Sequence, residues 1–139
     1  MKKVLLPVDG SQRSLRTVAK VRELCRPGTH TIAVVRVISV HPSPSYLDQV
    51  AQIQRGTREV QPQLDAVAAL LPGYQVETQV LVCSSPGAGI VTYAKDTGVD
   101  MILMTRSSRG PLRQLGSVAA YLVRNAPFAD LVILREGEG

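Results

Sequence analysis

Short apolar runs alternate with longer amphipathic stretches along the whole chain. The apolar runs predict strands over about residues 3–8, 31–40, 74–82, 101–105 and 129–134. Helical spacing of apolar residues predicts helices over about 12–24, 46–71, 86–96 and 118–124. This alternation predicts one α/β domain, residues 1–139, with a parallel sheet covered by helices on both faces.

Polar segments follow the first and the fourth of these predicted strands. The first strand ends in PVDGS, and the fourth runs into a loop that ends at Gly116-Ser117, where a helix begins. In such sheets, ligands bind at the carboxyl ends of strands where the strand order reverses. The free N–H groups and the dipole of a helix start favour an anion. The loop adds the cations Arg106, Arg109 and Arg113. We therefore predict a ligand site between Asp9 and Ser117.

The charge and hydropathy of the chain limit the classes of partner that we expect. The formal net charge is +5, but the basic residues are scattered and the chain has one Phe, so a stacking surface for nucleic acid is not expected. No apolar run approaches the roughly 20 residues of a membrane span. The apolar stretch after Met1 is too short for a signal peptide. We expect a cytoplasmic protein with neither a nucleic-acid nor a membrane partner.

The residues that usually bind metals or catalyse reactions are sparse. Cys25 and Cys83 match no metal or redox spacing, and we expect two buried, reduced thiols. His30 and His41 have no Cys or Asp at ligand spacing, so no metal site is expected. Asp9 is the one credible carboxylate near the predicted site. We therefore expect no enzyme, and a weak ATPase stays as an alternative.

Four segments resemble the universal stress protein family: VLLPVDGSQRS, VVRVISV, CSSPGAGIVTYAKDTGVDMILM and LGSVAAYLVRNAPFADLVIL. The resemblance covers nearly the entire chain. It implies a Rossmann-like, five-stranded sheet of order 3-2-1-4-5 and a homodimer that pairs through the strand at about 129–134. It also implies a regulatory role in the stress response. Many members of the family bind ATP through the motif Gly-x2-Gly-x9-Gly-Ser/Thr, with magnesium where it is bound, and some members lack the motif.

The resemblance carries over residue by residue. Asp9 matches the acidic residue that accepts a hydrogen bond from adenine or ribose, and Val37 matches an apolar residue near the adenine. Gly116 and Ser117 match the end of the phosphate-binding motif. Thr105 and Ser108 stand where its first two glycines should be, and the loop is about two residues shorter. The full predicted binding set is Pro7, Val8, Asp9, Val37, Met104, Thr105, Ser108, Gly116, Ser117 and Val118.

These departures leave two functions open. A β-branched Thr105 resists positive φ and adds side-chain atoms where ribose or phosphate should lie. Gly110 and the three arginines could compensate. The first hypothesis is a regulatory dimer with a degenerate adenine-nucleotide pocket. The alternative is an interaction module that binds no nucleotide and recruits a protein partner.

Asp130 also departs from an apolar family position, early in the strand expected at the dimer seam. Either like charges meet across the two-fold axis at a cost, or Asp130 faces solvent at the start of the strand.

Overall fold

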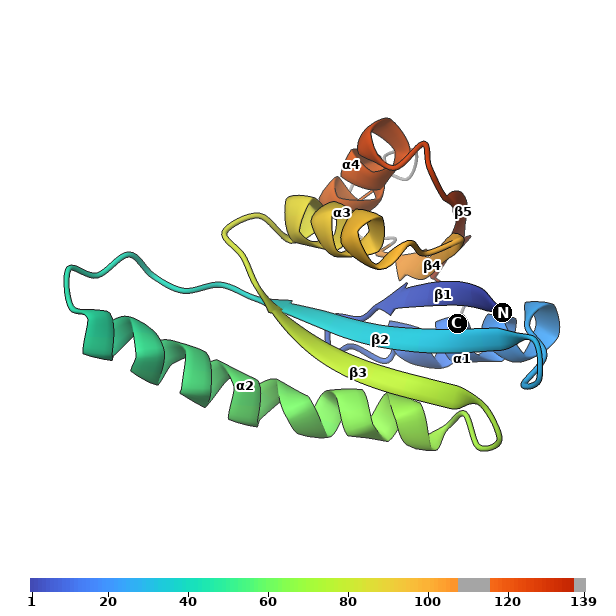
Figure 1. Ribbon diagram of the computed structural model, residues 1–139, viewed down its shortest axis with the longest axis horizontal. Helices are drawn as coiled ribbons and strands as arrows, with labels where there is room; N and C mark the ends of the chain where they lie inside the picture. The colour runs from blue at the N-terminus through green and yellow to red at the C-terminus, as the bar shows by residue number, and fades with distance from the viewer. Residues whose placement is uncertain (108–115, 137–139) are drawn as a thin grey trace.

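The computed structural model describes residues 1–107 and 116–136 (Figure 1). The elements follow one another as β1 (Lys2–Pro7), α1 (Arg13–Leu24), β2 (His30–Ile38), α2 (Tyr46–Ala69), β3 (Gln75–Val82), α3 (Pro86–Thr97), β4 (Met101–Arg106), α4 (Ser117–Asn125) and β5 (Asp130–Arg135). All strand pairs are parallel, and the sheet order is β3-β2-β1-β4-β5. The predicted fold class and strand order are confirmed.

Two layers of helices enclose the sheet (Figure 1). Helices α1 and α2 pack on one face, where Leu6, Val34 and Leu103 are fully buried. Helices α3 and α4 pack on the other face over Leu5, Val35 and Ile102. Successive strand residues therefore bury on opposite faces, which explains why β1, β2 and β4 are almost continuously apolar.

The two strands that precede the polar segments separate at their carboxyl ends. Strands β1 and β4 pair at Val4 with Met101 and at Leu5 with Ile102. Strand β1 continues beside β2 as far as Pro7, which pairs with Val35. The β1 and β4 exits therefore emerge side by side at the point where the strand order reverses, as the sequence predicts.

Helix α1 agrees with its predicted bounds to within one residue. It begins at Arg13, after a Gln12 cap that makes no side-chain hydrogen bond. Leu15 and Leu24 fit the helical spacing of apolar residues, but their side chains are 55% and 44% exposed. The buried stripe instead passes through Thr17, Val18 and Val21. Leu15 and Leu24 lie at the margins of that stripe.

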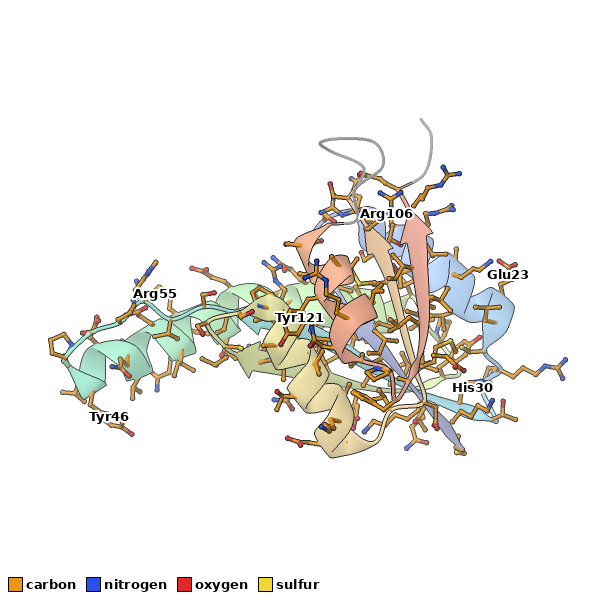
Figure 2. The ribbon with its side chains drawn as sticks, turned by 90° about the horizontal axis from the view of Figure 1, so that it is seen from above. Glu23, His30, Tyr46, Arg55, Arg106 and Tyr121 are labelled. Carbon is orange, nitrogen blue, oxygen red and sulfur yellow. The ribbon has the colours of Figure 1, made fainter. Side chains whose placement is uncertain are left out.

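Helix α2 is continuous through Gly56, and its first half extends beyond the sheet (Figure 1). Leu47 fits the helical spacing of apolar residues, but its side chain is 77% exposed there. The second half of the helix buries Val60, Leu64 and Val67 against the sheet. The exposed outer end carries Tyr46, which lies far from the rest of the molecule (Figure 2).

The fold also places the two cysteines and Asp130. Cys25 is buried, and burial raises the pKa of its thiol, but Cys83 is half-exposed, which corrects the expectation of two buried thiols. Asp130 starts β5 with an exposed side chain, while its backbone N–H donates to the Asp100 carbonyl at 2.9 Å.

No helix within residues 1–107 and 116–136 combines the length and the hydropathy of a membrane span.

Candidate functional site

A cavity of about 310 Å³ lies at the carboxyl ends of β1, β2 and β4. Nine of the ten residues in the predicted binding set line it: Pro7, Val8, Asp9, Val37, Met104, Thr105, Gly116, Ser117 and Val118. The tenth, Ser108, lies outside the described residues, as do Arg109, Gly110 and Arg113. The expected juxtaposition of Asp9 with Gly116-Ser117 is therefore present, and the part that each residue plays in binding stays a prediction.

Most of the cavity wall is apolar and comes from four elements. Val37 from β2 and Met104 from β4 face it from the sheet. Ile90 contributes from α3, and Val118 from the first turn of α4. Ligand pockets with such walls usually have volumes of about 300–1,000 Å³. The cavity thus offers a small apolar slot with polar groups at its edge.

Asp9 lies at that edge in a dense set of hydrogen bonds. Its Oδ1 accepts from the Ser11 N–H at 3.0 Å and from the Ser11 hydroxyl at 2.5 Å, and its Oδ2 accepts from Arg13 Nη2 at 2.5 Å. Burial alone would raise the pKa of this carboxyl, but the Ser11 and Arg13 contacts outweigh it and lower the pKa to about 2. Asp9 is therefore an ionised acceptor at neutral pH.

Gly10 makes the tight turn after Asp9. Its φ of +81° is in the left-handed region, and a Cβ there would lie 2.6 Å from Oε1 of Gln63. This turn brings Ser11 back onto the Asp9 carboxylate and places Arg13 in the first turn of α1. The sequence DGSQR thus builds the polar edge locally.

A second polar edge of the cavity is the start of helix α4. Gly116 is the N-cap residue, Ser117 is exposed in the first turn, and that turn contains no acidic residue. The first N–H groups of a helix lack partners within the helix, and the dipole makes this end partly positive. This edge can therefore bind an anionic group such as a phosphate.

Thr105 lies within β4, where a strand is predicted, and it lines the cavity. It has no positive φ, since among the described residues only glycines do. Its side chain turns toward α1, where its hydroxyl lies 2.8 Å from the Thr17 hydroxyl. At 8% exposure, Thr105 is packed at the base of the cavity.

Sequence reasoning missed several residues of the cavity. The described lining also includes Arg13, Ser14, Thr17, Val35, Arg36, Pro86, Ile90, Arg106, Ser107 and Ala119, of which only Arg106 had been proposed for the site. Arg106 closes β4 at its carboxyl end (Figure 2). Arg13 could have been found, since it follows Asp9 by four residues. Nothing in the sequence signals that α3 reaches the cavity through Pro86 and Ile90.

No group of three or more His, Cys, Asp or Glu side chains that could hold a metal occurs in the described part of the chain. Asp9 is the one acidic residue among the described lining residues.

The chain is similar to known proteins in sequence and in fold. A family model described as the universal stress protein family matches residues 1–134. No curated protein is similar enough in sequence to count as a match. Universal stress protein UspA from Lactobacillus plantarum is 20% identical, with a TM-score of 0.69 and coverage of 96% of this chain and 97% of that one.

Two similar structures contain adenine nucleotides. The universal stress protein from Archaeoglobus fulgidus in complex with dAMP is 18% identical, with a TM-score of 0.63 and coverage of 96% and 97% of the two chains. A universal stress protein family protein from Arabidopsis thaliana with AMP bound is 17% identical, with a TM-score of 0.64 and coverage of 99% of this chain and 93% of that one. These likenesses agree with the match of the family model. The chain belongs to the universal stress protein family.

Proposed function

We propose that this chain binds an adenine nucleotide in the cavity between Asp9 and Ser117, and that binding regulates a stress response. The observation that carries the proposal is the cavity itself, in which the β1 exit, an apolar slot and the α4 start are contiguous. Structures of family members with AMP and dAMP bound support the choice of ligand.

Each part of the cavity has a role in this proposal. The adenine ring lies in the slot lined by Val37 and Met104, and the Asp9 carboxylate accepts a hydrogen bond from the base or the ribose. The phosphate lies at the N-terminus of α4, beside Ser117. The described lining holds one carboxylate, so magnesium would enter with the phosphates of ATP, which supply its usual oxygen ligands.

The role that we propose is regulatory and not catalytic. Hydrolysis needs a base or a metal-held water to position the nucleophile. Asp9 is hydrogen-bonded to Ser11 and Arg13, and its low pKa makes it a poor base. No second acid lines the described part of the cavity.

We also propose a homodimer through β5. This strand lies at the edge of the sheet, and its central residues Leu131–Leu134 are all half-buried in the single chain. Nearby, Val123 and Phe128 are 53% and 42% exposed. An apolar edge strand of this kind is a template for pairing with another chain, and a two-fold axis would bury the same residues from both copies.

The expected compartment is the cytoplasm. Neither cysteine is in a disulfide, as is usual for proteins of reducing compartments.

Isothermal titration calorimetry of the purified protein tests the nucleotide proposal. We expect AMP, and ATP with magnesium, to bind at one site per chain, and GMP to bind more weakly because its base has a carbonyl where adenine has an amino group. Absence of binding by both adenine nucleotides, with the protein folded by circular dichroism, would contradict the proposal. That outcome would favour the interaction module that binds no nucleotide.

A further inference from the structure

Arg13 joins three parts of the molecule at the edge of the cavity. One arm of its guanidinium group pairs with Asp9, and the other lies 3.5 Å from Oε1 of Glu136, directly after β5. Its side chain is 21% exposed, and Arg13 lines both the nucleotide cavity and the groove beside α1. A small rotation of this side chain would therefore turn its N–H donors toward a ligand in the cavity.

Asp9 does not depend on Arg13 alone. The Ser11 N–H and hydroxyl both donate to Oδ1, and these bonds belong to the local turn. If Arg13 moved away, the carboxylate would stay held by Ser11, and Oδ2 would be free to accept a hydrogen bond from the base or ribose. Asp9 can thus exchange one donor for another without losing its position.

The described lining of the cavity carries an excess of positive charge. It contains the cations Arg13, Arg36 and Arg106 against the single acid Asp9. A phosphate in the cavity would be attracted by this charge, and the planar fork of Arg13 can bind a phosphate through two bonds.

We infer that Arg13 makes this site select phosphorylated over unphosphorylated adenosine, by exchanging Asp9 for the phosphate of the bound nucleotide. This inference rests on the proposed function and adds to it a specificity residue on α1. The helix α4 start supplies a second phosphate contact. The neutral nucleoside has no phosphate to replace the Asp9 contact of Arg13, so the exchange costs Arg13 that ion pair and the nucleoside binds less well.

The test is the ratio of AMP affinity to adenosine affinity, measured by calorimetry on four proteins. These are the wild type, Arg13→Gln, Arg13→Lys and the matched control Arg16→Gln, which removes the same charge from an exposed site on the same helix that does not line the cavity. We expect Arg13→Gln to lower the ratio roughly tenfold, as loss of one charge-assisted hydrogen bond implies. Arg13→Lys keeps part of the preference, Arg16→Gln keeps all of it, and adenosine binds Arg13→Gln at least as tightly as the wild type.

Two results would overturn the inference. The ratio could be unchanged in Arg13→Gln, with both ligands unaffected or equally weakened, as a purely structural role of Arg13 predicts. Alternatively, Arg16→Gln could lower the ratio as much as Arg13→Gln. The failure of the proposed function looks different, because the wild type would then bind neither ligand and both proposals would fall. If the wild type binds both ligands and the ratio does not depend on Arg13, only the inference fails.

Discussion

Replacing Ser117 by Asp is expected to lower the affinity for AMP by on the order of 100-fold while the fold stays intact. The new carboxylate would lie beside the phosphate at the start of α4, where like charges repel in a partly enclosed site. The same charge suits the positive end of the helix, and the first turn of α4 has no acidic residue of its own. Stability should therefore be unchanged or slightly higher.

Calorimetry measures the affinity, and thermal unfolding followed by circular dichroism measures the stability. Ser117→Asn is the matched control, because it has nearly the size of Asp without the charge, and it should bind AMP within a few-fold of the wild type. Equal losses in Ser117→Asp and Ser117→Asn would show a steric effect. Unchanged AMP binding in Ser117→Asp would place the phosphate away from α4.

Val132→Arg is expected to convert the proposed dimer into a monomer. Val132 lies in the middle of β5, half-buried in the single chain, so the long arginine stem can stay against the protein while its charge reaches the edge. Antiparallel pairing across a two-fold axis would bring the two new charges close together, and like charges in facing strands destabilise the pairing. Sedimentation velocity should therefore show a 15.0 kDa species in place of one of twice that mass.

Leu24→Arg provides the control for this variant. Leu24 ends α1 and is 44% exposed. Leu24→Arg also replaces an aliphatic side chain with a positive charge, but at a site away from β5. It should leave the dimer intact. A wild-type protein that is monomeric at all concentrations, or a Val132→Arg variant that stays dimeric, would contradict pairing through β5.

Continuous apolar runs predicted the sheet well, because β1, β2 and β4 are covered on both faces. Burial on both faces leaves few polar positions, so the runs are unmistakable and their order along the chain limits the topology. Strand β3 is half-exposed at the sheet edge, and its looser alternation predicted that place.

The inward faces of the helices were predicted less well, since spacing alone does not tell how far the sheet extends beneath a helix. Leu47 fits the apolar stripe of α2 but lies where the helix has passed the end of the sheet. Thr17 is polar in sequence yet fully packed, because its hydroxyl finds a partner in Thr105. Such pairs join residues 88 positions apart and leave no local signal.

The cavity was predicted from both of its edges, because strand exits and helix starts are local features. Asp9 follows the first predicted strand directly and precedes the Gly10 turn, and Gly116-Ser117 marks a helix start in the sequence. Thr105 lies in β4, inside the predicted strand, as its β-branched side chain favours. The contact between Arg13 and Asp9 was not predicted from the sequence.

The central claim is that an adenine nucleotide binds between the β1 exit and the α4 start. Titration of AMP into ¹⁵N-labelled protein, followed by two-dimensional NMR, tests it most directly. We expect saturable shifts of the backbone amides of Val8, Val37 and Ser117, with little change at Tyr46 on the outer end of α2. Saturable shifts that centre elsewhere, with these three amides unmoved, would contradict it.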